Sequence, residues 1–266
     1  MSRPYRPENK LWHLATTPES PCVYLPERGH SLDVYALLDS HGDSFDDVLA
    51  KGFRRSGPVY YVPECPGGCR ECVPVRVPVR EFRMSRSQRR VWKRCADQVT
   101  ARARPPRMKD EHHDLYNRHA RHVSATAKVA ERDDYEEFLC RPVGDTVQIE
   151  YLIDGRLAGV STLDLGKQDV SSVYFFWDPD LASYGLGTYS ALWEMEWCRE
   201  RGFRYYYLGY WIRDCSSMSY KTRFRPYELM DWNTMKWRRE CDDSRGDVGV
   251  ERGTGGEPGS DAGAAS

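Results

Sequence analysis

The sequence predicts an α/β protein in which mixed sheets pack against helices. Two segments, TVQIEYLI and RLAGVSTLDL, flank a turn at Asp154 and Gly155, and SSVYFFW follows them as a third predicted strand. Residues 187–201 have helical periodicity and end at Gly202, after which FRYYYLGYWI predicts another strand. A meander followed by a helix and a strand is the order expected of a mixed sheet covered by helices.

The first half of the chain predicts shorter elements, because proline and glycine interrupt it often. We expect a helix over residues 45–50 and a strand over residues 59–62, where Tyr60 and Tyr61 are flanked by valines. VPVRVPVREF then alternates apolar residues with arginine or proline. Since proline cannot donate to a β-ladder, we expect this segment to be an edge strand.

Helices dominate the prediction for the middle of the chain. Residues 85–103 contain no proline and carry apolar residues at four-residue spacing, with basic residues on the other faces. They predict a helix that ends before Pro105. Further helices are expected over residues 110–130 and 133–139.

The chain of 266 residues is long enough for two closely packed lobes with apolar cores. We expect an amino-terminal lobe over residues 1–108, with a cysteine cluster and a basic helix, and a carboxy-terminal lobe over residues 109–240. Residues 241–266 are rich in glycine and polar residues and bury too little apolar surface to fold. We expect them to form a disordered tail.

The composition favours a cytoplasmic protein. No stretch approaches the roughly 20 apolar residues of a membrane span, and MSRPYRPENK lacks the apolar core of a secretion signal. The nine cysteines are odd in number and unevenly spaced, which suits reduced thiols or a metal site better than a disulfide framework. We therefore expect neither a membrane partner nor a secreted protein.

The formal net charge of −1 hides a strong segregation of charge. Residues 76–107 hold ten Arg and one Lys against Glu81 and Asp97. Such a run favours contact with a polyanion, and the alternative is a solvated basic helix.

Several motifs recur in a fixed order along most of the chain. They are PCVYLP (21–26), GFRRSG (52–57), the cysteine group with VPVRV (65–77), SRSQRR (85–90), LYNRHARH (115–122), SSVYFFWDP (171–179), GLGT (185–188), YYLGYWI (206–212) and MSYKTRFRPYE (218–228). Together they resemble the arginyl/leucyl-tRNA–protein transferases of the N-degron pathway, in particular the bacterial branch.

The resemblance implies two lobes of the GNAT-like acyltransferase fold. It further implies an aminoacyl-tRNA donor and, for the bacterial branch, transfer of leucine to proteins with N-terminal Asp or Glu, which marks them for degradation. Arginine as the donated residue is the first alternative. An acyl-CoA-dependent GNAT N-acyltransferase and a non-catalytic, metal-bearing RNA-binding module are the others. No DNA partner is expected.

The chemistry that the resemblance implies needs no cofactor and no nucleophilic side chain. The aminoacyl ester is already activated, so holding an amine beside it supplies much of the rate, about 7–11 kcal/mol at most. The sequence contains no G-x-S-x-G motif, in agreement with this. The positioning candidates are Tyr207, Tyr210 and Lys221. Both tyrosines can equally belong to the core, and the core is favoured for Tyr207.

An acidic acceptor residue requires cations, and arginine pairs with a carboxylate through two hydrogen bonds. The candidates for this role are Arg54, Arg55, Arg76, Arg223 and Arg225. Solvated surface charges or tRNA-phosphate contacts are the alternatives for each.

Other residues are candidates for tRNA binding. Gly185 and Gly187 precede a helix and resemble a loop that binds phosphate, although a tight turn or an acetyl-CoA site has the same pattern. Trp211 can stack on the terminal adenosine or belong to the core. The basic run contributes Arg86, Arg89, Arg90 and Lys93.

Four cysteines are candidates for zinc or an iron–sulfur cluster: Cys22, Cys65, Cys69 and Cys72. The C-x-x-C spacing at residues 69–72 is typical of ligands. The commoner bacterial pattern in the family is C-x-x-C-x-x-C, and Gly67 and Gly68 lengthen it here, which weakens the assignment of Cys65. Reduced cysteines without metal are the alternative.

Overall fold

The computed structural model describes residues 11–39, 41–124, 127–141 and 144–240. The tail predicted over residues 241–266 lies outside the described residues. The strands are β1 (Leu11–Thr16), β2 (Ser20–Pro21), β3 (Gly29–His30), β4 (Leu32–Leu37), β5 (Arg54–Ser56), β6 (Val59–Pro63), β7 (Val73–Pro78), β8 (Val99–Arg104), β9 (Asp145–Ile153), β10 (Arg156–Leu165), β11 (Asp169–Trp177), β12 (Tyr205–Trp211), β13 (Tyr227–Asp231) and β14 (Lys236–Glu240).

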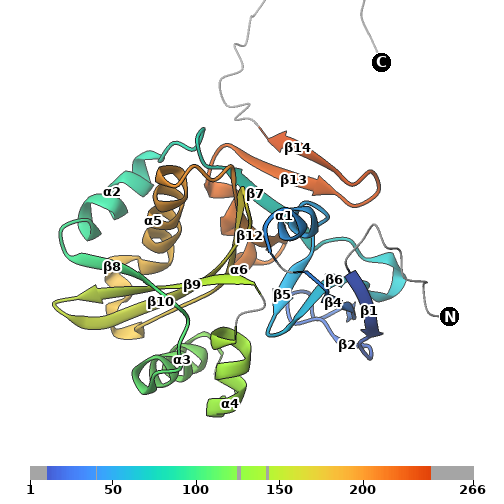
Figure 1. Cartoon of the computed structure of the whole chain (residues 1–266), viewed down its shortest axis with the longest axis horizontal. Helices are drawn as coiled ribbons and strands as arrows, with labels where there is room; N and C mark the ends of the chain where they lie inside the picture. The colour runs from blue at the N-terminus through green and yellow to red at the C-terminus, as the bar shows by residue number, and fades with distance from the viewer. Residues whose placement is uncertain (1–10, 40, 125–126, 142–143, 241–266) are drawn as a thin grey trace, which may run out of the picture.

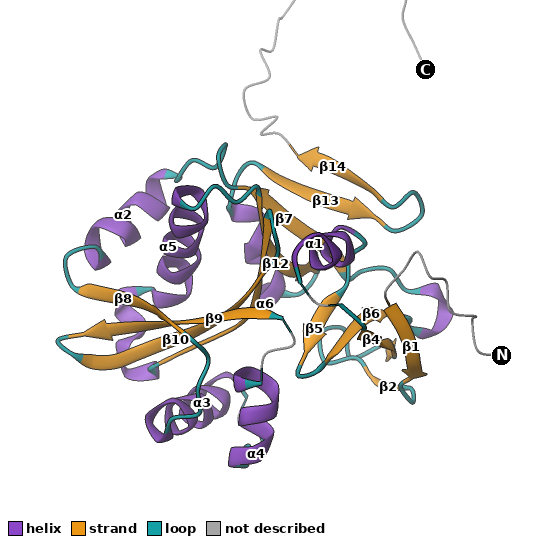
Figure 2. Cartoon of the chain, in the orientation of Figure 1, coloured by secondary structure: helices purple, strands orange, loops and turns teal. Residues whose placement is uncertain are grey.

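Helices connect and cover these strands (Figures 1 and 2). The α-helices are α1 (Gly42–Ala50), α2 (Arg86–Cys95), α3 (Asp110–Val123), α4 (Arg132–Tyr135), α5 (Leu186–Glu200) and α6 (Ser216–Ser219). The other helical turns are η1 (Pro66–Gly68), η2 (Glu136–Cys140), η3 (Pro179–Tyr184) and η4 (Tyr220–Arg223). No described helix has the length and apolar character to cross a membrane.

The main sheet has eight strands in the order β14-β13-β7-β12-β11-β10-β9-β8, and β11 and β12 are the one parallel pair among its described strands. Helices α2 and α5 pack together on one face (Figure 1), and the main core lies between α5 and the sheet. Helices α1 and α3 contact β11 from the other face, where Phe45 packs near Tyr207 and Leu115 near Phe176. The predicted α/β class with mixed sheets is confirmed.

The predicted meander is confirmed as β9, β10 and β11, which pair antiparallel in sequence order. The β9–β10 turn has positive φ at both Asp154 (50°) and Gly155 (77°), as a two-residue hairpin turn requires. The predicted helix over 187–201 is α5, and the strand after Gly202 is β12. Apolar runs bounded by turn signals were sufficient here, although β10 and β12 are buried along most of their length.

The segment VPVRVP was expected at a sheet edge, but β7 is a central strand between β12 and β13. The prediction is wrong because the prolines avoid one of the two ladders. Strand β13 pairs with β7 only at Val75 and Arg76, which lie between Pro74 and Pro78. Both prolines pair with β12 near the ends of that ladder.

The helix predicted over residues 85–103 is correct only in its first half. Ser85 and Gln88 form a reciprocal capping box at the start of α2, which ends at Cys95. Residues 99–104 form β8, which pairs with β9 along its whole length. Apolar residues alternate with polar or basic residues in VTARAR, and pairing with β9 decides in favour of a strand.

A separate four-stranded sheet, in the order β1-β4-β6-β5, uses only residues before 64. Strands β7 and β8 precede residue 108 and nevertheless belong to the main sheet with β9 to β14. Strands from both sides of the expected lobe boundary therefore share one sheet. Helix α3 also ends at Val123, earlier than the predicted residue 130.

Candidate active site

The two parallel strands at the centre of the main sheet separate along their length. Strand β11 pairs with β12 only from Asp169 to Ser171, opposite Tyr205 to Tyr207. Beyond that point β11 continues along β10, and β12 continues along β7 after an irregularity between Tyr207 and Gly209. We call this place the strand divergence. It opens the middle of the sheet towards the amino-terminal strands.

Strand β5 places Arg54 in the strand divergence. Its guanidinium donates to Ser171 Oγ at 2.9 Å and to the carbonyl oxygen of Ser172. The residue is 7% exposed. Arg54 forms no ion pair with any described residue, so its buried charge meets only neutral acceptors.

A second buried cation, Lys221, reaches the same place from η4. Its Nζ donates to the carbonyl oxygen of Tyr210 at 2.7 Å and lies 3.4 Å from Met218 Sδ. Burial, and then the charge of Arg54, lower the pKa of Lys221 to about 7, while Cys72 opposes the shift. No carboxylate in the described part of the chain pairs with it. Lys221 can therefore exchange a proton near neutral pH.

The two cations converge over Gly209. A Cβ atom at this glycine would lie 3.4 Å from Lys221 Nζ and 3.5 Å from two nitrogens of Arg54. Its φ of 93° also favours glycine. Two buried cations without a counterion are unfavourable, and an anion placed between them would relieve the cost. This pair, which we call the cation pair, is the strongest candidate for binding a carboxylate.

The walls around the cation pair are neutral. Burial and the neighbouring Tyr61 raise the pKa of Tyr24 to about 12, and burial together with three other cysteines raises the pKa of Cys72 to about 12. Tyr210 donates its hydroxyl to the carbonyl oxygen of Gly52 at 2.9 Å, and its ring meets Tyr61 edge-on. Tyr210 therefore shapes the site through its ring and its backbone carbonyl.

Arg55, the neighbour of Arg54, has a different environment. It pairs through two nitrogens with Asp164, at 2.5 and 3.0 Å, and also donates to the carbonyl oxygen of Gly57. Because Asp164 already neutralises it, the charge of Arg55 is not open to an acceptor carboxylate.

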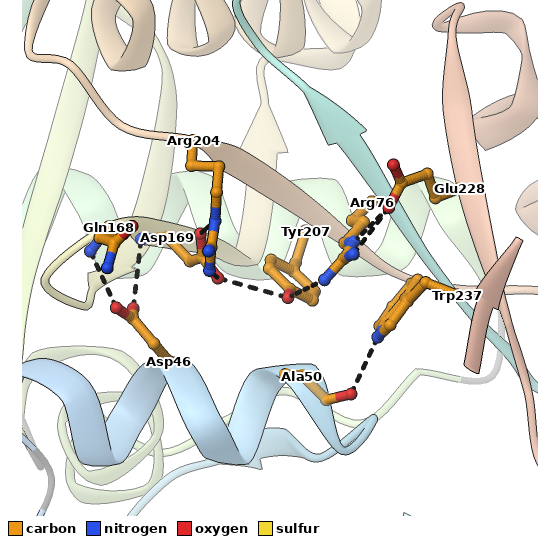
Figure 3. A network of polar contacts seen from close by, with 9 residues as sticks. All are labelled: Asp46, Ala50, Arg76, Gln168, Asp169, Arg204, Tyr207, Glu228 and Trp237. Carbon is orange, nitrogen blue, oxygen red and sulfur yellow. Dashed lines mark hydrogen bonds and ion pairs between the residues drawn. The ribbon is translucent and has the colours of Figure 1, made fainter. Parts of the chain in front are cut away.

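Arg76 is likewise engaged within the protein (Figure 3). It pairs with Glu228 at 2.7 Å and donates to Tyr207 Oη at 2.9 Å. Its guanidinium carbon lies 3.7 Å from the ring centre of Tyr205 and 4.1 Å from that of Trp237. Arg76 and Tyr207 are thus parts of a balanced structural network rather than of the cation pair.

The same network joins α1 to the main sheet. Asp46 accepts hydrogen bonds from the backbone N–H groups of Gln168 and Asp169, and burial raises its pKa to about 6. Arg204 forms two hydrogen bonds with Asp169, and Trp237 donates to the carbonyl oxygen of Ala50. We call these contacts, with those of Arg76, the ion-pair network (Figure 3).

The predicted tRNA contacts are not among the residues that form the cation pair. The four predicted cations of α2 are exposed, and so are Arg223 and Arg225, which do not join the cation pair. Gly185 starts α5 in a left-handed conformation without a side-chain cap. Trp211 is half-buried on β12. The predicted tRNA contacts on α2 are Arg86, Arg89, Arg90 and Lys93.

The four candidate metal ligands lie near one another, because the charges of Cys22, Cys65 and Cys69 all affect Cys72. Burial first, and then the neighbouring cysteines, raise the pKa of both Cys65 and Cys72. Cys69 accepts a hydrogen bond from Arg28 at 3.3 Å. Within the described ranges, no group of three or more His, Cys, Asp or Glu residues is arranged to hold a metal ion. Metal binding by Cys22 and its three neighbours stays a prediction.

Ser171, Ser172 and Gly209 were not recognised from the sequence. An isolated glycine within YYYLGYW is a signal for a bulge or a close approach, and it marks this position. The serines carry no such signal, since their role depends on Arg54 arriving from a strand more than a hundred residues earlier.

Comparisons with known proteins match most of the chain. The family model "Arginine-tRNA-protein transferase, N terminus" matches residues 20–90, and the corresponding C-terminal model matches residues 111–231. Two relatives carry the name aspartate/glutamate leucyltransferase. The one from Hahella chejuensis is 40% identical over 80% of this chain and 92% of its own, and the one from Chromobacterium violaceum is 37% identical over 84% and 94%.

Among solved structures, L-PGS from Bacillus licheniformis matches with 13% identity and a TM-score of 0.47. The match covers 62% of this chain and 63% of that protein.

Proposed function

Because the chain belongs to the arginine-tRNA–protein transferase family, we propose that it moves leucine from leucyl-tRNA to the α-amine of proteins that begin with Asp or Glu. The leucine extension would mark such proteins for degradation. The names of the two relatives support leucine as the donated residue and an acidic residue as the acceptor. Charged tRNA is made in the cytoplasm, where we place the reaction.

The observation that carries the acceptor choice is the cation pair. Arg54 and Lys221 are buried, converge over Gly209 and meet no carboxylate among the described residues. An aspartate or glutamate side chain supplies the missing negative charge, and an uncharged first residue does not. Arg54 is our primary carboxylate ligand, since arginine can donate through two nitrogens.

Arrival of the acceptor carboxylate would also prepare the amine for attack. The charge of Arg54 contributes to the low pKa of Lys221, so a carboxylate that neutralises Arg54 raises that pKa. Neutral Lys221 then takes a proton from the acceptor's α-ammonium group, whose own pKa is about 8. The carbonyl of Tyr210 orients the lysine for this transfer.

The freed amine attacks the carbonyl carbon of the aminoacyl ester. An amide C–N bond forms, the ester C–O bond breaks, and the terminal ribose oxygen leaves with a proton. The ester is already activated, so this step needs no cofactor, and the contribution of the protein is mainly alignment of the two reactants. We place the ester in the strand divergence, beside Gly209.

Metal analysis tests the role of the four cysteines separately. We expect protein purified without oxygen to contain far less than one metal ion or cluster per chain. A stoichiometry near one would instead assign Cys22, Cys65, Cys69 and Cys72 to a bound metal.

One assay tests the proposed function. The protein is incubated with tRNA charged with labelled leucine or labelled arginine, and with peptides that begin with Asp, Glu, Asn or Lys. We expect label from leucyl-tRNA on the Asp and Glu peptides. Label from arginyl-tRNA alone would replace leucine by arginine as the donor. Transfer only from an acyl-CoA would refute the proposal.

A further inference from the structure

Strand β11 holds the guanidinium of Arg54 through two hydrogen bonds. Nη1 donates to Ser171 Oγ at 2.9 Å, and Nη2 donates to the carbonyl oxygen of Ser172. Ser171 is 1% exposed and is the last residue of β11 that pairs with β12. The contacts to Arg54 therefore lie where the two strands separate, and a buried hydroxyl group occupies Nη1.

Another edge of the same guanidinium faces Gly209. A Cβ atom at Gly209 would lie 3.5 Å from both Nε and Nη2 of Arg54, and 3.4 Å from Lys221 Nζ. The guanidinium has one hydrogen on Nε and two on each Nη nitrogen. Because Nη2 gives one hydrogen to the carbonyl of Ser172, it keeps the other beside the hydrogen of Nε. Two parallel donors therefore remain on the edge that faces Gly209.

Two parallel N–H donors match a carboxylate and reject a side-chain amide. Each oxygen of a carboxylate accepts one hydrogen bond from such an edge, as in paired arginine–carboxylate contacts. The amide of Asn or Gln has nearly the same shape, but it places an NH2 group where the second acceptor is needed. One donor of the site is then left unpaired, and this weakens binding of the amide.

This match depends on the rotation of the guanidinium. Among the described residues, Ser171 is the one side chain that hydrogen-bonds to Arg54, and Ser172 adds a backbone carbonyl. Without the hydroxyl of Ser171, a single backbone contact would hold Arg54. The guanidinium could then turn its paired donors away from Gly209.

We propose that Ser171 is a positioning residue that determines the acceptor specificity. By holding Nη1 of Arg54, it turns the Nε–Nη2 edge towards Gly209. The carboxylate of an acceptor Asp or Glu binds to that edge, and the amide of Asn or Gln does not. The inference rests on the proposed function, because it takes an acidic first residue as the acceptor.

Steady-state kinetics of Ser171→Ala tests the inference. With saturating leucyl-tRNA, KM for an Asp-starting peptide should rise about tenfold, because Arg54 loses the hydrogen bond that orients it. The kcat should change little, since the carboxylate contact holds the acceptor equally in the ground state and the transition state. An Asn-starting peptide should lose much less, so the preference for Asp should fall. Ser171→Thr keeps a hydroxyl group and should restore most of the preference.

The matched control is Ser161→Ala on the neighbouring strand β10. Ser161 is also fully buried, and its hydroxyl donates to Glu194 in place of Arg54. Both substitutions should lower the free energy of unfolding in urea, because each removes a buried hydrogen bond. Ser171→Ala should change KM for the Asp-starting peptide, and Ser161→Ala should not. A purely structural role for Ser171 would make the two variants behave alike.

Peptide binding without tRNA separates this inference from the proposed function. In calorimetric titrations the wild type should bind the Asp-starting peptide more tightly than the Asn-starting one, and Ser171→Ala should lose most of that difference. This result without any leucyl transfer would refute the proposed function alone.

Four results would overturn the inference itself. They are equal binding of the two peptides by the wild type, unchanged KM and binding in Ser171→Ala, an equal loss on both peptides, and the same loss in Ser161→Ala.

Discussion

The strand divergence and the ion-pair network both bury arginine, and they differ in what balances the charge. In the network, the buried Arg76 pairs with Glu228, and the exposed Arg204 pairs with the buried Asp169. At the divergence, Arg54 and Lys221 meet only hydroxyl, carbonyl and thioether groups among the described residues. We infer that a buried cation paired with a carboxylate of the protein stabilises the fold, whereas a buried cation without one marks a place for a ligand.

The largest effect on stability is expected at β5, where the balanced Arg55 is next to the unbalanced Arg54. Replacing Arg55 by Gln leaves Asp164 buried without its partner, so we expect the free energy of unfolding to fall by about 3–5 kcal/mol. Urea denaturation measures the loss. The matched variant Arg54→Gln removes an unbalanced charge and should cost about 1 kcal/mol or less. Equal losses at the two positions would remove the distinction.

Transfer activity should be more sensitive to the change at Arg54 than to the change at Arg55, which is the reverse of the order expected for stability. Arg54→Gln should lower kcat/KM for an Asp-starting peptide about 100-fold, or about 2.7 kcal/mol, because the acceptor carboxylate loses its charged donor. Steady-state kinetics with leucyl-tRNA measures it. Arg54→Lys keeps the charge without the paired donors and should fall in between. Unchanged transfer by Arg54→Gln would remove this residue from the acceptor site.

The pH dependence of transfer tests Lys221. Below its pKa of about 7 the lysine is charged and cannot accept a proton, so kcat/KM should rise about tenfold per pH unit and bend near pH 7. A second bend near pH 8 should come from the peptide amine. Lys221→Met should lose only the first bend. A profile identical to that of the wild type would exclude Lys221 as the proton acceptor.

The smallest effect is expected from Asp46 in the ion-pair network. Burial raises its pKa from 3.8 to about 6, so the folded protein keeps a proton that the unfolded chain releases between these values. Stability should therefore fall as the pH rises from about 4 to 6. Asp46→Asn should flatten this part of the thermal stability curve, and the exposed neighbour Asp47→Asn should not. Parallel curves for all three proteins would show that Asp46 does not titrate as described.

The sequence predicts those parts whose signals are local. Strands β9 to β12 and helix α5 follow from apolar runs and from the turn signals at Asp154, Gly155 and Gly202. Strand β8 does not, because VTARAR suits a helix or a strand and its pairing with β9 decides. The central place of β7 depends on β12 and β13, which come more than a hundred residues later.

For the candidate site, Arg54, Tyr210 and Lys221 were predicted as functional residues, and the structure brings them together. Their separate roles are still proposals. The sequence alone does not separate Arg54 from Arg55, since GFRRSG presents both arginines in the same local context. The distinction depends on Asp164, which lies 109 residues away from Arg55. A single sequence does not reveal which residues distant along the chain form such ion pairs.

The central position of β7 has a consequence for synthesis of the protein. A nascent chain exposes β7 early, but its neighbours β12 and β13 emerge only after residues 205 and 227. Until then both edges of β7 are open to pairing with other chains. The cation pair likewise forms only after Lys221 has left the ribosome, so a truncated product would be exposed to aggregation before it could be active.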